Sequence, residues 1–193
     1  VLNYPKMKVK PGSMGKPLPG TQAAILTEQG QRAEPGEPGQ LAIRYPHPQV
    51  MLGYWNMSEL TAQALVDGWY HTGDGGYFDE DGYLFLVDRI KDMIISGGEN
   101  VYPAEVENVL FSHPQIADVA IIGLKNEKWG EIPLAIIIKS DDSLSEETVM
   151  SYCQDKLARF KQPKGVRFVA EIPRNPSGKI LKRVLRERFP EDA

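Results

Sequence analysis

The sequence has 193 residues, with 22 Lys and Arg against 26 Asp and Glu and a formal net charge of -4. A composition of 41% hydrophobic and 25% charged residues is typical of a globular protein with a sizeable core, and it excludes disordered, collagen-like and coiled-coil chains. No apolar run approaches the ~20 residues of a membrane span. Because Cys153 is the single cysteine and the three histidines are scattered, we expect no disulfide, no metal site and a reducing, cytoplasmic location.

The charge is unevenly distributed along the chain. Residues 1–88 carry 6 basic and 10 acidic residues, whereas residues 89–193 carry 16 of each. Between Lys156 and Arg188 there are eleven basic residues, and only Glu171 and Glu187 oppose them. A basic segment of this kind indicates an anionic ligand.

The first 88 residues are predicted to be mostly β-structure with tight turns. The many Pro and Gly residues of 10–20 predict a loop, and strands are expected at 21–27, 40–45 and 69–72. Residues 58–66 fit a short helix with Ser58 as its N-cap. The strongest hairpin signal is Asp81-Gly82, which β-prone residues flank on both sides.

After Asp88 the pattern alternates between strands and amphipathic helices. Strands are expected at 93–95, 116–124, 133–139 and 166–170, and helices at 103–111, 145–160 and 180–189. Pro103 suits a first helical position, and Ser143 or Ser145 suits an N-cap. The sequence therefore predicts an α+β protein, with a β-rich part at 1–88 and a small α+β domain at 89–193 that has a short central sheet and flanking helices.

Two segments near the boundary carry charged residues beside strands. In residues 69–76, the Asp74 carboxylate is followed by two glycines and is suited to bind a vicinal diol such as a ribose, although a plain β-turn would also use Asp and Gly. In residues 88–92 the charges alternate. Either this is a salt-bridged surface, or Arg89 contacts a nucleotide beside a mobile joint.

Two further segments combine glycine with functional side chains. Gly97 and Gly98 would let a ligand approach the backbone closely, although an ordinary strand-to-helix connection would also use glycine. Residues 173–180 lack the glycine spacing of a phosphate-binding P-loop. They instead present Lys179 from a Pro-stiffened turn, as a point charge for a carboxylate or phosphate or as a solvated surface lysine.

The order of these segments resembles the C-terminal part of an AMP-forming acyl-CoA synthetase, in the adenylate-forming superfamily. Residues 70–74, 88–100 and 176–179 match three ordered family motifs, and Gly39 to Ile43 with Gly53-Tyr54 matches a fourth. The resemblance covers nearly the whole chain. Residues 8–17 and 44–48 are similar to the acetyl- and medium-chain members.

The resemblance implies two half-reactions, in which a small carboxylic acid and ATP give acyl-AMP and pyrophosphate, and CoA then displaces AMP. It implies that Asp74 and Arg89 bind the nucleotide and that Lys179 is the catalytic charge between the carboxylate and the α-phosphate. Lys91 would be the hinge of a mobile C-terminal domain, and Gly97 and Gly98 would line the CoA tunnel. Mg²⁺ would be bound mainly through ATP.

The same resemblance implies that the chain is a fragment. Residues 1–88 would be the last subdomain, a distorted β-barrel, of a large N-terminal domain, and residues 89–193 the complete C-terminal domain. The family's phosphate loop and acyl pocket have no counterpart here. We therefore expect a partner in the rest of the large domain and no adenylate formation by this chain alone.

There are three alternatives, the first within the superfamily and the other two from different classes. The first is an adenylation domain that loads a carrier protein, although residues 177–183 look more like the CoA-ligase version. The second is a non-catalytic module derived from the family, which the presence of Asp74, Arg89 and Lys179 disfavours. The third is a nucleic-acid binder, and the absence of aromatic residues interleaved at a recognition surface, together with the interspersed apolar core positions, argues against it.

Overall fold

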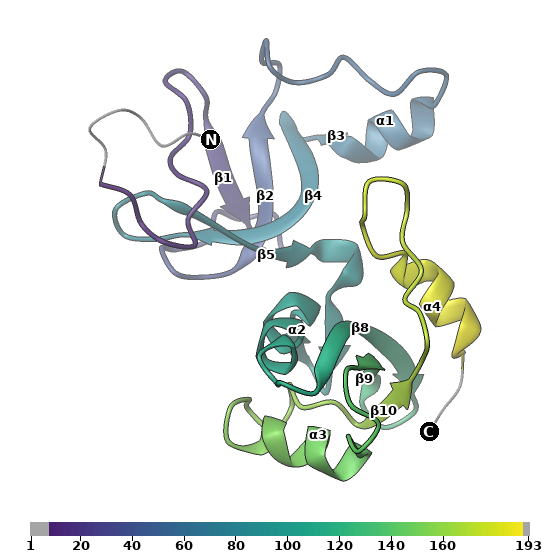
Figure 1. Cartoon of the computed structure of the whole chain (residues 1–193). Coiled ribbons are helices and arrows are strands. Elements are labelled where there is room, and N and C mark those ends of the chain that lie inside the picture. Colours follow the sequence, from purple (N-terminus) through teal and green to yellow (C-terminus); the bar gives the residue numbers. More distant parts are fainter. Residues whose placement is uncertain (1–7, 191–193) are drawn as a thin grey trace. The chain divides into compact units, whose positions relative to one another are not determined.

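The computed structural model describes residues 8–190, and these form two compact units that divide between Lys91 and Asp92 (Figure 1). The α+β class predicted from the sequence is confirmed. No helix among the described residues has the length and apolar content needed to cross a membrane.

The first unit is a curled antiparallel sheet with the strand order β1-β2-β4-β3, in which β5 also pairs with β4. Two small apolar clusters lie on this sheet, one around Ala42 and one around Leu84. The elements are β1 Ala23–Leu26, β2 Gly39–Arg44, α1 Ser58–Ala64, β3 Leu65–Val66, β4 Trp69–Phe78 and β5 Leu84–Arg89.

Two local predictions in this unit were wrong. Helix α1 has Met57 as its N-cap and lacks a side-chain cap, so Ser58 does not play that role. Strand β4 does not end before the glycines but continues to Phe78. A Cβ at Gly76 would lie 2.4 Å from the Phe85 carbonyl oxygen, so glycine is required there by close strand approach.

The second unit is a sheet with helices on both faces. Its strands are ordered β10-β9-β6-β7, with β8 paired to β9, and β10 runs parallel to β9. The elements after the 3-10 helix η1 Ile90–Asp92 are β6 Ile94–Ser96, β7 Glu99–Val101, α2 Pro103–Phe111, β8 Ile116–Asn126, β9 Gly130–Lys139, α3 Glu146–Gln154, β10 Gly165–Phe168 and α4 Lys182–Arg188.

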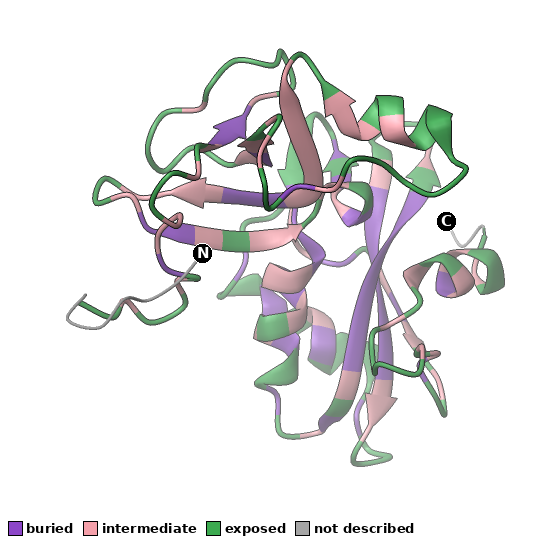
Figure 2. Cartoon of the chain, turned by 90° about the horizontal axis from the view of Figure 1, so that it is seen from above, coloured by how far each residue is buried: buried purple, intermediate pink, exposed green. Residues whose placement is uncertain are grey.

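Strands β8 and β9 form a long hairpin that is buried on both faces (Figure 2). Alternate residues enter different cores. Ile121 and Ile137 pack with Val106, Leu110 and Val149 of helices α2 and α3. On the opposite face, the cluster of Ile122, Leu134 and Ile136 includes Leu185 of α4 and Ile172 of the segment between β10 and α4. The hairpin therefore holds the three helices in place and carries the loops at both of its ends.

The predicted starts of α2 and α3 in the second unit are confirmed, whereas the predicted end of α3 is wrong. Pro103 lies in the first turn of α2, and the Ser145 hydroxyl accepts a hydrogen bond from the Thr148 amide at the start of α3. Helix α3 ends at Gln154 and not near Phe160. Leu157 and Phe160 reach the same core from the turns that follow, which explains why the apolar spacing looked helical.

Candidate active-site elements

In the first unit, Asp74 and Arg89 lie directly opposite each other on β4 and β5. The Arg89 Nε is 3.1 Å from Asp74 Oδ1, and both side chains are partly exposed. The register of the two strands shifts just beyond this pair, between Gly75 and Gly76, and such a bulge redirects the neighbouring side chains. The result is an accessible carboxylate beside a guanidinium, which together offer acceptors and donors to a diol.

Thr72 holds the backbone that leads to Asp74. Its hydroxyl donates to the Leu41 carbonyl at 2.8 Å and accepts from the Asp74 amide at 3.1 Å. Gly73 follows with a φ of 78°, a conformation that glycine adopts without strain. Thr72 thus fixes the irregular part of β4 from which Asp74 projects.

Two tyrosines, which the sequence analysis included in motifs without giving them a role, adjoin this pair. Burial raises the pKa of the Tyr70 phenol, and the neighbouring Tyr54, which hydrogen bonds to it, raises the pKa further. The Asp74 carboxylate also acts in this direction, whereas Arg89 opposes it. The electrostatic environment of Tyr70 therefore includes both candidate nucleotide-binding residues.

Lys91 lies in the short helix η1, with its side chain exposed, at the point where the two compact units divide. The next residue, Asp92, is buried, and its carboxylate accepts a hydrogen bond from Arg186 of α4 at 3.2 Å. The first residue of the second unit is thereby fixed to that unit's last helix.

In the second unit, Gly97 and Gly98 form a two-residue hairpin turn between β6 and β7, with Ser96 paired to Glu99. This corrects the expectation of a strand-to-helix connection. Both glycines have positive φ, 64° and 86°, as the tightest hairpin turns require. The Gly97 amide donates to the Trp129 carbonyl at 2.7 Å, so the turn is attached to the tip of the β8–β9 hairpin.

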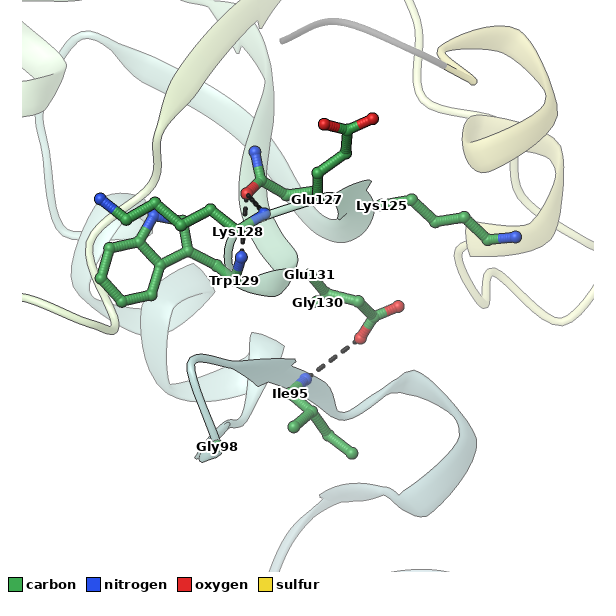
Figure 3. A pocket seen from close by; sticks show the side chains of 9 residues that line it. Ile95, Gly98, Lys125, Glu127, Lys128, Trp129, Gly130 and Glu131 are labelled. Atoms are coloured by element: carbon green, nitrogen blue, oxygen red, sulfur yellow. Dashed lines mark hydrogen bonds between the residues drawn. The ribbon is translucent and has the colours of Figure 1, made fainter.

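Trp129 contributes to two open pockets beside this turn. The larger, of about 1320 Å³, lies between Ile95, Gly98 and the hairpin tip. In Figure 3 the Glu131 carboxylate points to the Ile95 amide, which donates to it at 3.1 Å, while Lys128 extends along the Trp129 ring.

The smaller pocket, of about 660 Å³, joins Gly97 and Trp129 to Arg159, Phe160 and Lys164. These last three residues belong to the basic segment noted in the sequence. Burial lowers the pKa of Lys164, and the nearby Arg159 cation lowers it further. The pocket therefore combines aromatic walls with clustered positive charge, an environment suited to an anionic ligand that carries an aromatic ring.

The loop that carries Arg159 and Lys164 is held by contacts around it. Lys161 forms hydrogen bonds of 2.8 Å with both carboxylate oxygens of Glu105 in α2. The Lys164 amide donates to the Pro133 carbonyl of β9. These contacts bring the basic segment to the Gly97 turn, although the two are distant in the sequence.

Lys179 lies in the exposed loop between β10 and α4. Its ammonium forms no hydrogen bond or ion pair with any residue in the described range 8–190. Within that range, no group of three or more His, Cys, Asp or Glu side chains is arranged to hold a metal ion.

Comparison with known proteins identifies the class. Residues 2–55 match the model of the AMP-binding enzyme family, and residues 105–179 match the model of the AMP-binding enzyme C-terminal domain. The chain belongs to this family of adenylate-forming enzymes.

Relatives with curated functions include CoA ligases. The chain is 48% identical over 180 residues to a long-chain-fatty-acid–CoA ligase of Mycobacterium tuberculosis, an alignment that covers 93% of this chain and 35% of the relative. The chain therefore spans about a third of that protein's length.

Two solved structures are similar to this chain over nearly its whole length. The ATP-bound MatB of Rhodopseudomonas palustris superposes with a TM-score of 0.87 at 36% identity, over 96% of this chain and 37% of that one. The O-succinylbenzoate CoA synthetase of Bacillus subtilis, in complex with ATP and magnesium, has a TM-score of 0.82 at 39% identity, over 92% of this chain and 36% of that one.

Proposed function

We propose that the chain is the C-terminal portion of an ATP-dependent carboxylate–CoA ligase that forms acyl-AMP and then acyl-CoA. The observation that carries this proposal is the pocket in which Gly97 and Trp129 meet Arg159 and Lys164. A thiol acceptor with a long neutral arm and a phosphorylated nucleotide fits a glycine-lined turn followed by an aromatic, basic wall. The family membership and the CoA-ligase relatives support the same activity.

In the first half-reaction, we assign the nucleotide to Asp74 and Arg89. The Asp74 carboxylate can accept hydrogen bonds from both ribose hydroxyls, and the Arg89 guanidinium beside it can donate to ribose or phosphate oxygens. Lys179 supplies a positive charge where negative charge develops on the α-phosphate and the attacking carboxylate. Its ammonium, which has no partner among the described residues, is available for that contact.

In the second half-reaction, we assign the CoA arm to the Gly97–Gly98 turn and the CoA phosphates to Arg159 and Lys164. Lys91 would be the hinge between the two half-reactions, as its position at the division between the compact units supports. Residues 89–193 would then be the mobile domain. Mg²⁺ would be coordinated mainly by the phosphates of ATP, as the family resemblance implies.

Measuring the two half-reactions separately tests the proposed role of Lys179. In the complete ligase, Lys179→Ala should reduce carboxylate-dependent ATP–pyrophosphate exchange by about 100-fold or more, the usual loss when one transition-state charge contact is removed. Thioester formation from supplied acyl-AMP should remain within about threefold, since Lys179 takes no part in it. An equal loss in both steps contradicts this assignment.

The 193-residue chain alone should show no exchange, and exchange by that chain would refute the requirement for the rest of the large domain.

Substitution of a cationic residue of the pocket tests whether CoA is the acceptor. Arg159→Ala should raise the KM for CoA about tenfold, a typical loss for one charge-assisted contact, while leaving the KM for pantetheine unchanged because pantetheine lacks the phosphates. Arg183→Ala is the matched control, because that guanidinium is exposed and pairs with Glu187 on its own helix. If CoA is no substrate but a carrier protein is, the carrier-loading alternative replaces this proposal.

A further inference from the structure

Residues 173–181 form a small loop that hydrogen bonds close at its two ends. Lys179 lies near the second of these ends. Arg174 and Ile180 pair as an isolated antiparallel bridge, and the Leu181 amide donates to the Pro173 carbonyl at 2.8 Å. Inside this bridge, the Gly178 amide donates to the Asn175 carbonyl at 2.9 Å. The loop is therefore a defined turn, although it is exposed.

Asn175 binds both backbone polar groups of Lys179. The backbone N–H of Asn175 donates to the Lys179 carbonyl at 2.9 Å, and the side-chain oxygen Oδ1 of Asn175 accepts from the Lys179 backbone N–H, also at 2.9 Å. The same oxygen accepts from the amide and the hydroxyl of Ser177 at 3.1 and 2.8 Å. A single side-chain oxygen thus organises the turn, which an aliphatic residue at 175 could not do.

Arg174 connects this turn to the buried sheet. Its Nη1 donates to the Gly178 carbonyl and its Nη2 to Asp118 Oδ2 on β8, both at 2.7 Å. The other Asp118 oxygen accepts from the Val119 amide at 2.9 Å. Because the guanidinium is planar, one side chain fixes the distance between the residue before Lys179 and the central hairpin.

We propose that Asn175, Arg174 and Asp118 are positioning residues that hold the Lys179 backbone in place for adenylate formation, an inference that rests on the proposed role of Lys179. The bonds described above fix the backbone on both sides of Lys179, whereas its ammonium has no partner within residues 8–190. Misplacing a reacting group by about 1 Å can cost about 100-fold in rate, so a fixed backbone matters here.

These side chains belong to neither apolar core of the second unit, so their removal should leave that unit folded. The first measurement is amide hydrogen exchange by NMR on the 193-residue chain. Asn175→Ala should increase exchange at the Lys179 amide by about tenfold or more, since that amide loses its acceptor. Arg183→Ala, in the neighbouring helix, should leave that amide unchanged.

The second measurement is the rate of each half-reaction in the complete ligase. Asn175→Ala and Arg174→Ala should each lower kcat for ATP–pyrophosphate exchange by about 10- to 100-fold, with the KM for ATP and the thioester-forming step nearly unchanged. Arg174→Lys should recover part of the loss, because an ammonium can reach Asp118 or the Gly178 carbonyl but lacks the fork for both. Asp118→Ala combined with Arg174→Ala should cost little more than either alone.

The outcomes distinguish the two levels of the proposal. If Lys179→Ala abolishes exchange but Asn175→Ala and Arg174→Ala do not slow it, the positioning role is wrong and the role of Lys179 stands. If Lys179→Ala leaves exchange intact, the proposed function of this loop is wrong as a whole. An equal loss in both half-reactions would indicate a general structural defect and would also overturn the positioning role.

Discussion

The turn between β6 and β7 allows a matched pair of substitutions, Gly97→Ala and Gly98→Ala. Both residues have positive φ, so alanine at either position is strained by about 1–2 kcal/mol. Their surroundings differ. A Cβ at Gly97 would lie 2.8 Å from Trp129 Cε3, whereas a Cβ at Gly98 would have nothing within 4 Å.

The difference between the two variants therefore measures the contact with Trp129. An ordinary carbon–carbon contact is about 3.5–4 Å, so in Gly97→Ala the indole ring must retreat by roughly 1 Å from the added methyl group. The Trp129 backbone stays bound to the amide of residue 97, which confines the movement to the side chain. We expect Gly97→Ala to be less stable than Gly98→Ala by about 1–3 kcal/mol, the range for overpacking.

Urea denaturation of the 193-residue chain, followed by circular dichroism, measures this difference. Adding Trp129→Ala should remove most of it, because the truncated side chain leaves room for the new methyl group. In the complete ligase, Gly97→Ala should also raise the KM for CoA more than Gly98→Ala does. Equal destabilisation by the two alanines, or a difference that persists without the indole, would refute this reasoning.

Three further predictions concern the second unit. Leu110→Ala should cost about 2–5 kcal/mol in urea denaturation because Leu110 is fully buried, whereas Phe111→Ala, at a 61% exposed position, should cost under about 1 kcal/mol; similar losses would contradict the core assignment. Lys182→Met breaks a 2.8 Å ion pair with Glu107 that is largely shielded from solvent. It should lower the free energy of unfolding by about 3 kcal/mol, and a variant as stable as the parent would contradict this prediction. Burial raises the pKa of the Cys153 thiol from 9.0 to about 11. The stabilisation that follows from this pKa difference is complete below pH 9.0 and is lost as the pH rises toward 11. A thiol-specific reagent at about pH 8, where the thiol of an unfolded chain is already partly ionised, should accordingly modify the folded chain far more slowly than the urea-unfolded chain, and equal rates would exclude the burial.

Local signals in the sequence predicted most of the elements, and the errors have physical causes. The Asp81-Gly82 hairpin and the Pro103 helix start depend on neighbouring residues alone, and both were correct. The end of α3 was misplaced because Leu157 and Phe160 keep the helical spacing while entering the core from turns. The glycines after Asp74 suggested a turn, but there glycine serves a close approach between strands.

The candidate site was predictable only as far as motifs extend. Asp74, Arg89 and Lys179 stand out from their local sequence, the family resemblance implies their roles, and those roles remain predictions. No local pattern indicated that Trp129 would meet Gly97, because that contact depends on how the β8–β9 hairpin pairs with β6. Likewise, the ion pair of Arg174 with Asp118 joins residues far apart in the chain and follows from tertiary structure alone.

The two-sided burial of the β8–β9 hairpin restricts where this domain can change in length. A single residue inserted within either strand would move every later side chain to the opposite core, so insertions there should not be tolerated. Residues 127–129 at the tip are exposed and lie between the strands, so we expect insertions and deletions to be tolerated there. The tip forms the wall of the proposed acceptor pocket, while Asp118, near the other end of β8, supports the Lys179 loop. A longer or shorter tip would therefore change the wall of the proposed acceptor pocket while the loop that carries Lys179 keeps its geometry.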